Sequence, residues 1–114
     1  MKEGDVLLTA LPQADGTLKD RPVLFLCRMP PFDDFLVCGV STQLQQAASE
    51  LDEPIIPTEP DYRTSGLRSA SLIRLGFLAV LPRSKFKGRI GSISTARRLR
   101  LLTRLSDFLR PNTP

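Results

Sequence analysis

The sequence of 114 residues predicts a single, mainly β domain, residues 1–114, that ends in one amphipathic helix. Two apolar runs, Val23–Cys27 and Phe35–Val40, flank a segment with two prolines and two aspartates. Apolar runs of this length between breakers are typical of two buried strands joined as a hairpin. Ten prolines disfavour a mostly helical protein, because proline interrupts helices. The length suits one domain with a modest core.

Further strands are predicted on both sides of this hairpin. Asp5–Leu11 forms an apolar run that ends at Pro12, and the polar residues 13–20 contain an Asp-Gly turn signal. Residues 67–81 are apolar enough for one or two buried strands. Gly76 within them indicates a bulge or a close backbone approach.

Residues 84–93 alternate basic and apolar side chains, as a half-exposed edge strand does. Lysines such as Lys85 and Lys87 commonly protect the edge of a sheet from pairing with another chain. We therefore expect this segment to form an edge strand.

The last segment predicts an amphipathic helix with Ser94 as its N-cap. Apolar side chains recur at helical spacing and form one stripe, Ala96, Leu99, Leu102, Leu105 and Leu109, which Leu101 and Phe108 widen. Arginines are expected on the other faces: Arg97, Arg98, Arg100 and Arg104. The stripe is expected to cover the sheet, a second subunit or both, and the arginines to be solvated or to contact RNA.

Charge is divided unevenly between the two halves of the chain. Residues 1–61 carry four basic and eleven acidic side chains, whereas residues 62–114 carry twelve basic side chains and one acid, Asp107. A half this basic suggests a polyanion partner. The alternative is internal neutralisation by the acidic, proline-rich residues 44–66. A loop of that length is a lid, a binding loop or partly disordered, and the sequence leaves these alternatives open.

The sequence predicts no metal, no cofactor and no membrane segment. It has no histidine, and its two cysteines, Cys27 and Cys38, lie inside the apolar runs, so a zinc site is improbable. We expect both to be buried thiols in a reducing compartment. No secretory signal and no apolar stretch of membrane-spanning length are recognisable, which favours a cytoplasmic protein.

The hairpin predicts a meeting point of polar side chains. Arg21 precedes its first strand, and Ser41, Thr42 and Gln43 follow its second strand. In an antiparallel pair the start of one strand lies beside the end of the next. We interpret this rim, with one permanent cation and two hydroxyl groups, as the functional site. The alternative is a surface arginine next to a turn in which Ser41 and Thr42 bond the local backbone.

The order of these features resembles the MazF/PemK family of toxins from bacterial toxin–antitoxin systems. The similar segments are GDVLLTALPQADGTLKDRPVLFL, VCGVSTQ, GLRSASLIRL, GSIS and the C-terminal helix, between Gly4 and Leu109. The resemblance implies a small antiparallel SH3-like barrel of the MazF/PemK/CcdB type that forms homodimers. It also implies a metal-independent endoribonuclease for single-stranded RNA, and an antitoxin whose acidic or amphipathic segment occupies the RNA groove.

The resemblance also implies roles for single residues. Arg21 falls on the catalytic arginine of the family, and Ser41 falls where relatives usually have the catalytic threonine, with Thr42 next to it. We expect RNA contacts from five further residues: Gln43, Arg74, Lys19, Lys85 and Lys87. Gly76 stands where many relatives carry an acid, and histidine is absent from the sequence, so the general base is unassigned.

Metal-free RNA cleavage is an attack of the ribose 2′-OH on the adjacent phosphate, which leaves a 2′,3′-cyclic phosphate and a 5′-OH. Because charge builds on the nonbridging oxygens, an arginine fork is suited to stabilise the transition state. The alternatives are a catalytically weak or inactive toxin-fold protein that binds a protein target, by fold-level analogy with a gyrase-poisoning relative, or an RNA-binding module. RNA fragments with 5′-OH ends would separate these functions.

Overall fold

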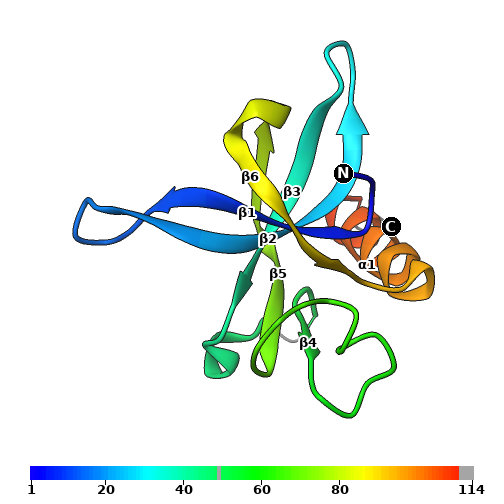
Figure 1. Cartoon of the computed structure of the whole chain (residues 1–114). Helices are drawn as coiled ribbons and strands as arrows, with labels where there is room; N and C mark the ends of the chain where they lie inside the picture. The colour runs from blue at the N-terminus through cyan, green and yellow to red at the C-terminus, as the bar shows by residue number, and fades with distance from the viewer. Residues whose placement is uncertain (49, 111–114) are drawn as a thin grey trace.

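The computed structural model describes residues 1–48 and 50–110, and it shows one antiparallel sheet followed by one helix (Figure 1). The strands are β1 (Asp5–Pro12), β2 (Leu18–Met29), β3 (Asp34–Ser41), β4 (Glu53–Ile55), β5 (Ser71–Leu81) and β6 (Phe86–Ser92). Two short 3-10 turns, η1 (Leu44–Gln46) and η2 (Arg83–Lys85), and the helix α1 (Thr95–Leu109) complete the fold. The predicted mainly β class with a terminal helix is confirmed.

The strand order is β4-β5-β3-β2-β1-β6, so over the described residues the sheet is open between β4 and β6. The closed barrel that the resemblance implies is therefore not formed. Strand β4 is three residues long, and the end of β6 is bound by a loop, since the Ser92 amide donates to the Thr64 carbonyl at 2.8 Å. The predicted edge strand at residues 84–93 is confirmed as β6.

The predicted hairpin is confirmed as β2 and β3, in which Val23 lies across from Gly39 and Met29 from Asp34. The polar loop after β1 is shorter than expected, because β2 begins at Leu18 and pairs with β1 as far as Pro12. The β1–β2 and β2–β3 hairpins project in different directions from the sheet (Figure 1).

Strand β5 carries the bulge that Gly76 indicated. Cys38 of β3 pairs with Leu78, but the next residue, Gly39, pairs with Arg74. The three residues between these partners therefore have no counterpart on β3. This extra length places Gly76 and Phe77 out of the regular alternation of a strand.

Two apolar clusters form the core. One is mainly aromatic and contains Phe25, Phe35 and Phe86, with the ring centroids of Phe25 and Phe35 3.8 Å apart. The other contains Leu24, Leu26, Cys38 and Leu75 and is covered by α1 through Leu101 and Leu105. Both cysteines are free thiols, and Cys38 is fully buried as expected. The expectation was wrong for Cys27, which is only half-buried.

The buried face of α1 differs from the predicted stripe. Leu101 and Leu105 are buried as predicted, but Leu99, Phe108 and Leu109 are exposed. Arg97, which was expected on another face, is buried. Arg97 belongs to this face because three carboxylates of the preceding acidic segment bind its guanidinium, at 2.8 Å (Asp61), 2.6 Å (Glu59) and 3.2 Å (Glu53). Arg100 and Arg104 also pair with Glu53. The acidic segment thus neutralises the helix, as one of the two alternatives for the charge predicted.

Candidate functional site

A cleft of about 820 Å³ opens where β2 begins, β3 ends and the loop before β5 crosses the sheet. Its polar lining contains three arginines, Arg21, Arg68 and Arg74, together with Ser41, Thr42 and Gln43. The only carboxylate among the described lining residues is Asp20, and Lys87 binds it at 2.7 Å. The cleft is therefore cationic and suited to an anion.

The antiparallel register explains why these side chains meet. At this end of the hairpin, Val23 of β2 pairs with Gly39 of β3. If the same register is continued by two residues, Arg21 lies opposite Ser41. The structure thus brings together the four side chains that the hairpin was expected to bring together: Arg21, Ser41, Thr42 and Gln43. Arg74 reaches the same cleft because it lies across from Gly39 on β5.

Arg21 is half-buried and held by one amide. Its Nη2 donates to Oε1 of Gln13 at 3.0 Å, and Nε2 of Gln13 donates to the Leu11 carbonyl at 3.0 Å. No carboxylate of the described residues forms an ion pair with Arg21. Its remaining N–H groups are thus left to bind a ligand.

The acids nearest to Arg21 in sequence are engaged elsewhere. Asp15 accepts hydrogen bonds from the Thr17 hydroxyl at 2.7 Å and the Thr17 amide at 3.0 Å, and these bonds lower the pKa of Asp15. Asp20 lies next to Arg21 but pairs with Lys87. Neither carboxylate is placed as an evident base.

Arg74 is half-buried, and its Nε is buried without a hydrogen-bond partner among the described residues. A buried donor without a partner is uncommon and costs free energy, so it marks a place where an acceptor would be stabilised. Arg68, on the loop before β5, is exposed and forms no ion pair within the part of the chain that the structure describes. The combined charge of Arg68 and Arg74 therefore faces the cleft without an acidic partner.

The hydroxyl of Ser41 is oriented by its own turn. Its Oγ accepts a hydrogen bond from the Gln43 amide at 3.0 Å, which is the local backbone bonding that the alternative interpretation predicted. Because Oγ is the acceptor in this bond, its own proton stays available to donate to an anion. The Gln43 side chain accepts from Gln45 Nε2 at 2.7 Å, so its NH2 group is also free to donate.

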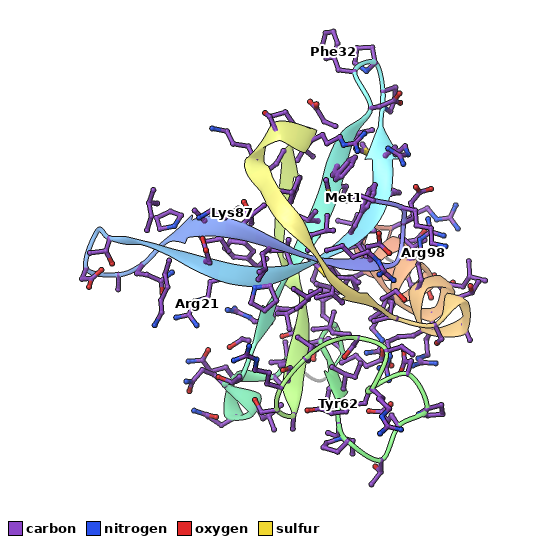
Figure 2. The ribbon with its side chains drawn as sticks, viewed as in Figure 1. Met1, Arg21, Phe32, Tyr62, Lys87 and Arg98 are labelled. Atoms are coloured by element: carbon purple, nitrogen blue, oxygen red, sulfur yellow. The ribbon has the colours of Figure 1, made fainter. Side chains whose placement is uncertain are left out.

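Three lysines that were expected to contact RNA do not line the cleft: Lys19, Lys85 and Lys87. Lys87 instead pairs with Asp20, the residue that borders the cleft next to Arg21. Figure 2 shows Arg21 and Lys87 on opposite sides of the β1–β2 ribbon. Any contact of these lysines with RNA would lie outside the cleft.

Among the cleft residues that the sequence analysis did not single out are Gln13, Arg68 and Phe77. The positive charge of Arg68, within the GLRSAS segment, could have marked it as a phosphate-binding residue. Nothing in the sequence around Gln13 or Phe77 points to the cleft. The described residues contain no group of three or more His, Cys, Asp or Glu side chains that could hold a metal. No helix in the described ranges is long and apolar enough to span a membrane.

We compared the chain with models of known protein families, with curated protein sequences and with solved structures. The chain matches the family model described as PemK-like, MazF-like toxin of type II toxin-antitoxin system over residues 2–109. Among solved structures it is similar to the Mycobacterium tuberculosis toxin MazF-mt6, with a TM-score of 0.68, 18% identity, and coverage of 96% of this chain and 99% of that chain. At this identity the likeness shows the fold alone. No curated protein sequence matches the chain. Because the family model spans nearly all of its length, this protein belongs to the PemK-like, MazF-like toxins of type II toxin–antitoxin systems.

Proposed function

We propose that this protein is an endoribonuclease that cuts single-stranded RNA without a metal ion. The observation that carries the proposal is the cleft in which Arg21, Arg74 and Ser41 line one space and no carboxylate pairs with either arginine among the described residues. Membership of the family supports it, since MazF/PemK toxins are generally endoribonucleases. The cleft would hold one phosphodiester of the RNA backbone.

In this mechanism the ribose 2′-OH attacks the adjacent phosphate and the 5′-oxygen of the next nucleotide leaves. Arg21 donates to the nonbridging oxygens, on which negative charge accumulates in the transition state. The Gln13 amide keeps the guanidinium aimed, so that little reorganisation is needed during the reaction. Arg74 offers its unpartnered Nε to the same backbone.

The hydroxyl groups complete the anion site. The Ser41 hydroxyl keeps its proton for a phosphate oxygen, because its oxygen already accepts from the Gln43 amide. Thr42 is exposed at the cleft rim, where its hydroxyl would position the sugar. The resemblance implies the position of the catalytic threonine for Ser41, with Thr42 next to it.

In this proposal the 2′-OH gives its proton to solvent, and the departing 5′-oxygen takes up a proton from solvent to become the 5′-OH. Arginine is a poor base because its guanidinium stays charged, and Asp20 is held by Lys87. The sequence has no histidine, the side chain that most often exchanges protons near neutral pH. Arg21 therefore acts by stabilising charge.

The decisive experiment incubates the purified protein with single-stranded RNA in EDTA and maps the new ends. We expect fragments with 2′,3′-cyclic phosphate and 5′-OH termini. Cleavage that requires added Mg²⁺, or that yields 5′-phosphates, would reject the proposed chemistry.

A second function, binding without cleavage, is favoured by one observation: the only carboxylate lining the cleft in the described residues is already paired. A protein of this kind would bind RNA or a protein target through the same arginines. RNA binding without any fragment carrying a 5′-OH would support this function over the nuclease.

We further propose that the antitoxin expected for a type II toxin carries an acidic or amphipathic segment that binds in the same cleft. Its carboxylates would replace the phosphates on Arg21 and Arg74. Competition between such a segment and RNA tests this. The homodimer and the cytoplasmic location remain predictions, and light scattering of the purified protein tests the first.

A further inference from the structure

Phe77 is an aromatic residue of the cleft with an unusual setting. If Gly39 carried a β-carbon, that atom would lie 3.1 Å from Cδ1 and 3.3 Å from Cγ of Phe77. The ring thus lies directly against the backbone of β3, at the one position of that strand end where no side chain is present. The residue as a whole is still 41% exposed.

The bulge of β5 creates this setting. Gly39 pairs with Arg74, and Leu78 pairs with Cys38, so residues 75–77 have no partner on β3; Leu75 is buried in the core, whereas Phe77 is exposed. The chain between these two pairs folds Phe77 back over Gly39. As a result Phe77 and Arg74 meet at the same point of β3, and both line the cleft with Arg21.

Single exposed aromatic side chains are common and need no explanation by themselves. The neighbours of Phe77 are what point to a ligand. Arg74 has a buried Nε without a partner among the described residues, and Arg21 forms no ion pair there. An aromatic face flanked by guanidinium groups is the combination by which proteins hold single-stranded nucleic acid, with bases stacked on the ring and phosphates on the cations.

We propose that Phe77 is the stacking platform for an unpaired nucleobase next to the phosphate that Arg21 and Arg74 hold. This inference rests on the proposed function and adds to it the residue that holds the base next to the bound phosphate. The nucleotide at this point must be unstacked, because a base inside a duplex cannot offer its face to the ring. Gly39 is the residue that makes room for the platform.

The chain has no tryptophan, so Phe77→Trp introduces a single fluorescent reporter at the proposed site. The probe is a short single-stranded RNA with 2′-O-methyl riboses, which cannot be cleaved by 2′-OH attack. We expect the tryptophan emission to be quenched as the RNA binds. The matched control is Phe32→Trp, at the tip of the β2–β3 hairpin, where the side chain is 81% exposed and lies far from Arg21 (Figure 2).

Emission from Phe32→Trp is expected to stay constant over the same titration. If the RNA binds, as shown by anisotropy of a labelled strand, and the emission of Phe77→Trp does not change, the inference is overturned. Quenching by an acidic peptide and not by RNA would also overturn it, because the ring would then serve a protein partner.

A second set of variants tests the platform without tryptophan. Phe77→Leu keeps an apolar side chain over Gly39 but removes the aromatic face, and RNA affinity should fall about 5- to 150-fold. Phe77→Tyr keeps the face and should retain affinity. Gly39→Ala would press on Cγ and Cδ1 of the ring and weaken binding in the native background, but should have little further effect once Phe77 is alanine, which lacks both atoms.

Failure of this inference is distinguishable from failure of the proposed function. If Phe77→Leu binds and cuts RNA as well as the native protein, the platform is wrong and the nuclease stands. If RNA binds and quenches Phe77→Trp but no 5′-OH fragments form with cleavable RNA, the platform stands and the nuclease is wrong.

Discussion

The guanidinium of Arg21 and the amide of Gln13 are joined by a 3.0 Å hydrogen bond from Nη2 to Oε1. The same amide is fixed by a second bond of 3.0 Å from its Nε2 to the Leu11 carbonyl. The end of β1 therefore sets the direction in which Arg21 points. This relationship makes Gln13 a positioning residue for the proposed reaction.

Removal of Arg21 should have the largest effect. Arg21→Ala is expected to lower the rate of RNA cleavage by about 10²–10³, because a preorganised donor to the transition state is lost. Cleavage kinetics of a labelled RNA measure this, and thermal unfolding verifies that the variant folds. The matched control is Arg83→Ala, since Arg83 is exposed and does not line the cleft. A native rate in Arg21→Ala would contradict the mechanism.

Replacement of Gln13 should separate orientation from binding. Gln13→Ala frees the guanidinium and is expected to lower kcat about 10-fold, the effect of losing one hydrogen bond to a charged group. Gln13→Glu would instead pair with Arg21 and compete with the phosphate, so KM should rise. Gln46→Ala, an exposed glutamine outside the cleft, serves as the control. Equal kcat and KM in all three variants would show that Gln13 does not position Arg21.

The hydroxyl of residue 41 should matter more than its side-chain size. Ser41→Ala is expected to lower the cleavage rate about 10-fold, because one donor to the phosphate is lost. Ser41→Thr keeps the hydroxyl on a stiffer side chain and should equal or exceed the native rate. Cleavage rates of the two variants are compared under single-turnover conditions. Equal rates for Ser41→Ala and Ser41→Thr would show that the hydroxyl of residue 41 takes no part in the reaction.

RNA affinity should depend on salt in proportion to the number of phosphate contacts. Three arginines in the cleft predict a slope of log K against log salt of about −2, since each contact with single-stranded nucleic acid contributes about −0.7. Arg68→Ala and Arg74→Ala should each make the slope shallower by about 0.7. Binding titrations in 50 to 300 mM salt measure this, and an unchanged slope in Arg68→Ala would place Arg68 outside the RNA path.

The ion-pair cluster on α1 should govern stability and not cleavage. Burial raises the pKa of Asp61, but hydrogen bonds from Arg97 and the Ser94 amide, with the charge of Arg97, outweigh it and lower the pKa to about 2. Because the folded pKa lies below the unfolded value, this carboxylate stabilises the fold above about pH 4. That contribution, about 2 kcal/mol, is lost as the pH falls through about 2.

Urea unfolding at pH 6 and at pH 2.5 measures this dependence. Asp61→Asn should be less stable than the native protein at pH 6 and should lose less stability on acidification. Arg97→Met should cost about 3–5 kcal/mol at pH 6, because it leaves buried carboxylates without a partner. Asp107→Asn, at an exposed position of α1, is the control. A native pH dependence in Asp61→Asn would refute the assigned pKa.

Much of the architecture follows from local patterns in the chain. The apolar runs around residues 23–27 and 35–40, with proline and aspartate between them, led to the β2–β3 hairpin. Antiparallel geometry then placed Arg21 near Ser41 without reference to any other segment. These features are predictable because they depend on residues close together in sequence and on the fixed geometry of a strand pair.

The buried face of α1 was not predictable in this way. Helical periodicity selected a leucine stripe, but Arg97 is buried because it meets carboxylates 36 to 44 residues earlier in the chain. A charged residue is assigned to the surface by any local rule. Only the contact with Asp61, Glu59 and Glu53 offsets the cost of its burial.

By itself, the sequence determined the β2–β3 hairpin, the terminal helix and the meeting of one arginine with a hydroxyl group. The tertiary structure decided which other groups share that cleft: Gln13 on one side, Arg68 and Arg74 on the other, and Phe77 over Gly39. The physical reason is that these neighbours depend on the register of non-adjacent strands. The three-residue bulge in β5 brings Arg74 and Phe77 to one place on β3. No local sequence pattern shows which residues of β3 will lie opposite this bulge.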